Sequence, residues 1–106
     1  MSELTALSSD VALCALRERL TAIEASMTNF PEGCAITETL KDWHEAYSLA
    51  LAQIEGGANV GSVAKAAGNS VVTAYIMRRS AIMIGCADVV FLLTGEKLNV
   101  GEVRNV

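Results

Sequence analysis

Aromatic residues and proline are scarce in this sequence, at 5% and a single proline in 106 residues. An all-β sandwich would need more aromatic residues and many more turn signals, so this scarcity argues against one. Disorder is excluded because 52% of the residues are hydrophobic, which provides enough apolar surface to offset the conformational entropy lost on folding. The length fits a single domain, so we expect one helical domain over residues 1–106.

Histidine and cysteine are also few, with one histidine and three cysteines. Cys14, Cys34 and Cys86 have neither metal-binding nor redox spacing, and an odd number does not make a disulfide framework. His44 has no second histidine to complete a zinc motif. The sequence therefore predicts a cytoplasmic protein without metal, cofactor or enzymatic activity. A catalytic or small-molecule role built around Cys34, His44 and Tyr47 is the alternative.

A long uncharged apolar run is missing as well. The most apolar region, residues 71–93, is interrupted by Arg78, Arg79 and Asp88. Its longest uncharged stretch, residues 80–87, is far shorter than the roughly 20 residues that a membrane-spanning helix needs. We therefore expect no contact with a membrane.

Two amphipathic helices are predicted in the first half of the chain, over residues 9–55. In each, apolar residues recur every third or fourth position, which places them on one helix face. These residues are Leu13, Leu16, Leu20, Ile23 and Met27, and then Ile36, Leu40, Trp43, Tyr47, Ala50 and Ile54. Helix-breaking residues within 28–33 separate the two segments, and Gly56 and Gly57 end the second segment. The pattern predicts an acidic antiparallel hairpin.

The second half, residues 61–93, predicts a short helix, a turn at residues 68–70 and a long helix from Ser70 to Leu93. The long helix is apolar nearly all round, which is typical of a helix surrounded by others. We therefore predict an all-α fold, a compact bundle of about four helices with one long central apolar helix and a loose tail over 94–106. A homodimer or another protein would supply the missing cover. The predicted core is Leu13, Leu16, Leu20, Ile23, Leu40, Trp43, Tyr47, Ile54, Ile76, Ile82 and Val89.

Acidic and basic residues are unevenly distributed along the chain, whose net charge is −4. Residues 1–57 carry nine acidic and three basic residues, whereas residues 58–106 carry three acidic and five basic ones. The overall acidity excludes a generally basic nucleic-acid coat but not a local basic patch. Glu38, Asp42 and Glu45 share one helix face because they are spaced by four and three. They form a candidate protein-binding surface, with an ordinary solvated face as the alternative.

Residues 63–78 resemble the helix-turn-helix of lac-repressor-type regulators, in which an alanine of the first helix faces a glycine in the turn. Ala64 and Gly68 match that pair, where the close helix crossing requires small residues. The candidate nucleic-acid contacts in this region are Lys65, Asn69, Ser70, Thr73, Arg78 and Arg79. Val71 and Val72 stand where the family enters the major groove, and they offer no hydrogen bond to base edges. A helix-turn-helix used only for packing is the alternative.

The absence of catalytic groups and the uneven charge favour a binding protein. In size and composition the chain resembles the small inhibitors carried by phages and mobile elements, including anti-CRISPR proteins. That resemblance implies stoichiometric docking on a host defence protein or protein–nucleic-acid complex, either on protein or on exposed nucleic acid. The alternative function is a small, dimeric helix-turn-helix regulator that binds DNA.

Overall fold

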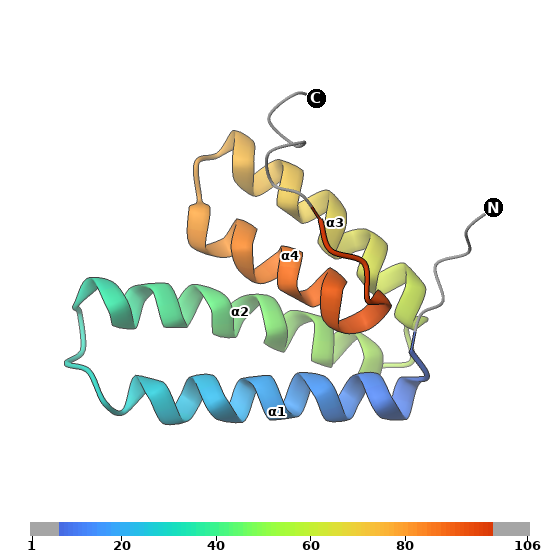
Figure 1. Ribbon diagram of the computed structural model, residues 1–106, viewed down its shortest axis with the longest axis horizontal. Helices are drawn as coiled ribbons and strands as arrows, with labels where there is room; N and C mark the ends of the chain where they lie inside the picture. The colour runs from blue at the N-terminus through green and yellow to red at the C-terminus, as the bar shows by residue number, and fades with distance from the viewer. Residues whose placement is uncertain (1–6, 99–106) are drawn as a thin grey trace.

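The computed structural model describes residues 7–98, which form four α-helices and no strand (Figure 1). The predicted all-α class and the number of helices are confirmed. The helices are α1 (Ser9–Met27), α2 (Ala35–Glu55), α3 (Val60–Ile76) and α4 (Ser80–Thr94). None of the helices in this part of the chain has the length and apolar character required to cross a membrane.

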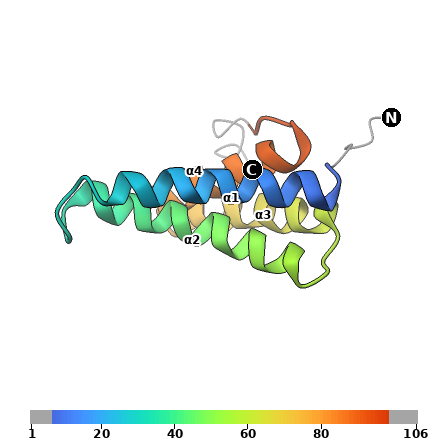
Figure 2. The ribbon, with the colours of Figure 1, turned by 90° about the horizontal axis from the view of Figure 1, so that it is seen from below.

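The two helices expected in the first half form, and α1 and α2 lie side by side in opposite directions (Figure 2). Ser8 caps α1, because its hydroxyl oxygen accepts the backbone N–H of Val11 at 3.4 Å. Gly33, with φ +86°, supplies the left-handed turn before α2. At the other end of the hairpin, Arg17 and Glu55 form an ion pair at 2.8 Å.

The helix boundaries predicted for the second half are wrong. Helix α3 runs without interruption from Val60 to Ile76, so residues 68–70 lie inside a helix and make no turn. The chain turns instead at residues 77–79, and α4 begins at Ser80. The predicted long central helix, Ser70 to Leu93, is thus divided between the second half of α3 and α4.

Helix α3 continues through Gly68 because one glycine costs a helix less free energy than the burial of nearby apolar side chains contributes. Gly68 within a helix costs about 0.5–1 kcal/mol relative to alanine. Val63 and Val71, on either side of it, are both buried, and burying a valine side chain contributes about 1.5–3 kcal/mol. Continuing the helix through Gly68 keeps both valines in the core. The burial of the two valines therefore outweighs the cost of the glycine.

The helices lie across the molecule in the order α1, α2, α4, α3, so α4 is flanked by α2 and α3 (Figure 1). The bundle is flat, with dimensions of 47 × 35 × 19 Å. Helices α2 and α4 approach closely at Gly85, where a Cβ atom would lie 3.2 Å from the Ala46 Cβ and 3.3 Å from the Trp43 Cδ1. Glycine at this position therefore lets the two helices pack closely.

Most of the predicted core is buried, in two adjoining clusters. Ile76 is the clear exception, because its side chain is 72% exposed at the end of α3. It was assigned to the core of a continuous helix that the structure divides at this point. Leu13 and Trp43 are half-buried rather than buried. Of the predicted tail, Thr94 belongs to α4 and residues 99–106 lie outside the described residues.

We expect alanine at the two helical glycines to have opposite effects on the free energy of unfolding. Gly68→Ala should raise it by about 0.5–1 kcal/mol, because a Cβ there meets nothing within 4 Å and alanine is the better helix former. Gly85→Ala should lower it by up to about 2 kcal/mol, because overpacking against α2 exceeds that gain. Urea unfolding followed by circular dichroism measures both. A loss of stability in Gly68→Ala would contradict a continuous α3 and favour a tight turn there.

Candidate functional site

Helix α3 presents one row of exposed side chains along its length. Lys65, Asn69 and Thr73 are exposed and four residues apart, so they share one face. The opposite face is buried in the core through Val63, Ala64, Val71 and Ala74. Ser70 is half-buried beside the row. The structure thus brings three of the predicted nucleic-acid contacts onto a common surface, which we call the α3 face.

The exposed Arg78 lies in the turn that follows α3. The Arg78 N–H donates to the Tyr75 carbonyl at 3.1 Å, and the Arg79 N–H donates to the Ala74 carbonyl at 2.8 Å. These two bonds define a Schellman motif, in which glycine usually occupies the left-handed position. Here that position holds Arg78, with φ +58°. The backbone therefore carries strain at a residue that displays a positive charge.

The segment that contains this turn has no acidic residue of its own, since residues 56–87 contain neither aspartate nor glutamate; the nearest acid recorded at the turn is Asp42 of α2, 3.7 Å from Arg79. Lys65 and Arg78 form no ion pair within the described part of the chain. Two large apolar side chains, Ile76 and Met77, are exposed beside Arg78, and Tyr75 is partly exposed. The turn is thus a basic tip with apolar and aromatic neighbours.

The remaining predicted contacts are Arg79 and the acidic row of α2, which consists of Glu38, Asp42 and Glu45. All of them except Glu45 lie close to an oppositely charged side chain of the same protein. Arg79 lies 3.7 Å from the Asp42 carboxylate, and Lys41 lies 3.4 Å from Glu38. Glu45 is exposed. Two members of the acidic row are therefore engaged with cations of the same chain, which reduces their availability to a basic partner.

A partly buried polar cluster, which the sequence pattern did not predict, joins three helices at Asp88. The Tyr47 hydroxyl of α2 donates a hydrogen bond to the Asp88 carboxylate of α4. The Arg19 Nε of α1 lies 3.3 Å from the same carboxylate oxygen. Burial, and then the hydrogen bond to Asp88, raise the pKa of Tyr47 above its ordinary value of about 10. A lone acid in an otherwise apolar helix is the sequence signal that predicts such a partner.

Cys34, His44 and Tyr47, the three residues of the alternative catalytic role, each have different partners. The Cys34 thiol lies 3.2 Å from the Thr37 hydroxyl, and this side-chain hydrogen bond lowers the pKa of Cys34. The Nε2 atom of His44 lies 2.8 Å from a carboxylate oxygen of Glu24, and its Nδ1 atom lies 3.2 Å from the Ser48 hydroxyl. The structure therefore does not bring the three residues into one site.

The chain of Ser48, His44 and Glu24 has the residue types of a nucleophile, a base and a carboxylate. Acyl transfer also needs free N–H donors for the developing oxyanion. Ser48 lies in the interior of α2, where helix hydrogen bonds occupy the backbone N–H groups. This surface can exchange protons, but it supplies no backbone donors for an oxyanion.

Among residues 7–98, no three histidine, cysteine, aspartate or glutamate side chains are grouped so that they could hold a metal ion. Comparisons of the chain with protein-family models, with curated proteins and with solved structures found no match.

We expect Tyr47 to make the protein less stable in alkali. Its raised pKa means that the folded state holds the phenol proton more tightly than the unfolded chain. Its contribution to stability is therefore complete below pH ~10 and declines above it, by at most about 1.4 kcal/mol per pH unit. Tyr47→Phe should remove this part of the decline and cost about 1–2 kcal/mol at neutral pH. Urea unfolding between pH ~8 and ~11 measures both, and equal alkaline slopes for the two proteins would contradict this assignment.

We expect Arg78→Gly to stabilise the fold by roughly 0.5–1 kcal/mol. Glycine removes the cost of the left-handed conformation in the folded state, about 1–2 kcal/mol. Part of this gain is lost because glycine also increases the conformational entropy of the unfolded chain. Arg79→Gly is the matched control, because Arg79 has φ −101° and glycine there should only destabilise. Thermal unfolding distinguishes the two variants, and a destabilised Arg78→Gly would show that the arginine side chain itself supports the turn.

Proposed function

We propose that this protein acts by stoichiometric binding rather than catalysis, as an inhibitor of the anti-CRISPR type. In this proposal the α3 face and the basic tip dock on exposed nucleic acid of a host protein–nucleic-acid complex. The observation that carries the proposal is the row of Lys65, Asn69 and Thr73 along α3, with the exposed Arg78 in the turn after it, in a segment without acidic residues. Phosphate groups would be its natural complement.

The residues on the α3 face favour contacts with the sugar-phosphate backbone over reading of bases. Lysine, arginine, asparagine and threonine side chains all donate hydrogen bonds to phosphate oxygens. Lys65 and Arg78 have no acidic partner in residues 7–98, so pairing them with phosphate breaks no ion pair there. The expected binding is thus dependent on salt and tolerant of sequence.

A single strand fits this surface better than the major groove of a duplex. The sequence resemblance to a helix-turn-helix would direct Val71 toward the groove, but Val71 is 0% exposed in the core. The turn that the motif requires lies inside α3. In contrast, the tip offers Tyr75 beside Arg78, and single-strand binding proteins combine aromatic stacking with cationic contacts to phosphate.

We expect the purified protein to retard a single-stranded oligonucleotide in a gel-shift titration, more strongly than the matching duplex. Raising the salt from about 50 to about 200 mM should weaken the complex. The double variant Lys65→Ala/Arg78→Ala should bind at least ten times more weakly. Its slope of log affinity against log salt should be shallower by about 1.4, because each lost phosphate contact of a single strand contributes about 0.7.

Lys41→Ala is the matched control, because it removes one cation from the acidic hairpin and should leave binding unchanged. Absence of binding at low salt would exclude nucleic acid as the partner. Equal salt slopes for the wild type and the double variant would show that binding uses another surface. Adding the protein in stoichiometric amounts to reconstituted nucleic-acid-guided nucleases then tests inhibition directly.

A further inference from the structure

The exposed face of α4 is the most apolar surface that the proposed function leaves unused. Ile84 and Phe91 are 50% and 46% exposed, and the half-buried Ala87 and Asp88 lie between them. We call these four residues the α4 stripe. The helices α2 and α3 flank α4 on either side of a flat bundle (Figure 1). The Ile84 and Phe91 side chains are left exposed between them.

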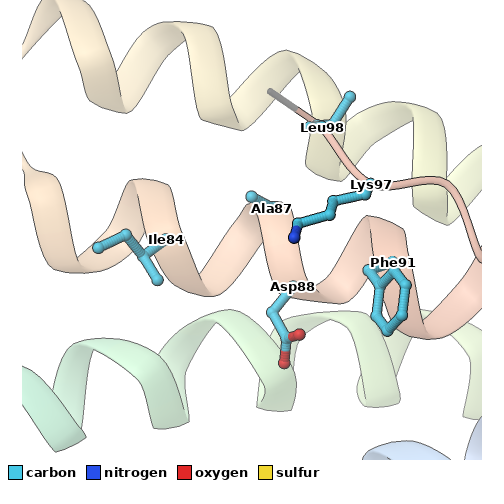
Figure 3. A pocket seen from close by; sticks show the side chains of 6 residues that line it. All are labelled: Ile84, Ala87, Asp88, Phe91, Lys97 and Leu98. Atoms are coloured by element: carbon cyan, nitrogen blue, oxygen red, sulfur yellow. The ribbon is translucent and has the colours of Figure 1, made fainter. Parts of the chain in front are cut away.

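Ile84 and Asp88 of the α4 stripe form a ridge between two hollows, and Ala87 and Phe91 line the second of them. One hollow, of about 370 Å³, lies between α1, α2 and α4 and is lined by Leu40, Trp43 and Ile84 among others. The second, of about 340 Å³, lies where Lys97 and Leu98 fold back beside Phe91 (Figure 3). Ile84 and Asp88 line both hollows. A ridge between grooves is the shape that packs against another helix.

The charges around the stripe are balanced, although the whole chain is acidic. Arg19 and Asp88 form an ion pair at 3.3 Å, and Asp88 also accepts a hydrogen bond from Tyr47. Glu96 and Lys97 are adjacent and both exposed just beyond the helix. Two acidic and two basic groups thus surround this face. Two copies of the chain can meet here without net repulsion, whereas the acidic hairpins would repel each other.

The spacing of the four residues along the stripe is symmetric about its midpoint, between Ala87 and Asp88. Ile84 and Phe91 are equally far from that point in sequence, one on each side. In an antiparallel pair of α4 helices, Ile84 of each copy therefore meets Phe91 of the other. The small Ala87 side chain at the centre lets the two helices approach closely, and the two helix dipoles run in opposite directions.

We infer that the α4 stripe is the interface of a homodimer, with a two-fold axis that passes between Ala87 and Asp88. Isologous contact is the commonest way in which soluble proteins assemble. It would bury the Ile84 and Phe91 side chains of both copies and place each ridge beside the hollows of the other. This inference is independent of nucleic-acid binding, because it uses a different helix face.

Sedimentation velocity over a range of protein concentrations tests the inference. We expect the wild-type protein to sediment as a dimer, and both Ile84→Glu and Phe91→Glu to sediment as single chains. Leu49→Glu is the matched control, because Leu49 is 58% exposed on α2 and should leave the dimer intact. Circular dichroism verifies that each variant is folded. A wild type that is monomeric at every concentration, or a dimer that only Leu49→Glu dissociates, would overturn the inference.

A cysteine at the proposed axis gives a second readout that does not require disrupting the interface. In a background with Cys14→Ser and Cys34→Ser, which leaves only the buried Cys86, Ala87→Cys should form a disulfide-linked dimer under mild oxidation. Ala66→Cys, at an exposed position of α3, should remain monomeric under the same conditions. Equal cross-linking of the two variants would count against the interface.

Discussion

The close packing of α4 on α2 at Gly85 places both the α3 face and the α4 stripe in the molecule. Because Gly85 has no Cβ, the helix sits directly against Trp43 and Ala46, and α4 takes the central position between α2 and α3. Helix α3 is then the outermost helix on one side, with one face in the core and the other free. The stripe on α4 stays open for the same reason, since the flat bundle has no fifth helix among the described residues.

Asp88, three residues after Gly85 and on the same face of α4, supports this arrangement. Its carboxylate is bound by Arg19 of α1 and Tyr47 of α2, so a single side chain ties together three helices. Partly buried charges are costly unless they are paired, and here both partners come from the hairpin. Apolar contacts hold α4 against its neighbours, while this polar cluster selects one register among the alternatives that a nearly uniform apolar helix would allow.

The helices of the first half could be predicted because their apolar residues recur with strong helical periodicity between clear breakers. The second half lacks that contrast between apolar and polar positions, since α3 is rich in alanine and valine and α4 is apolar nearly all round. Gly68 suggested a turn but lies within a helix, whereas the real turn is at Arg78, a residue type that seldom adopts a left-handed conformation. The only sequence signal for that turn was the pair of arginines within an apolar run. Ile76 was misplaced for the same reason.

The candidate contacts on α3 could be named from their side chains, but their common face depends on the helix being continuous. Asp88 was visible as a lone acid in an apolar helix, yet its partners lie far away in sequence and no local pattern identifies them. The charge asymmetry between the two halves survives folding as two distinct surfaces. One is an acidic hairpin with several internal ion pairs, and the other is a basic row without them.

Docking of the α3 face on nucleic acid is tested by an amide-resolved NMR titration of the labelled protein with a single-stranded oligonucleotide. We expect the amide signals of Lys65, Asn69, Thr73 and Arg78 to shift together, while those on the exposed side of α1 stay in place. Shifts confined to the acidic hairpin, or no shifts at low salt, would contradict it.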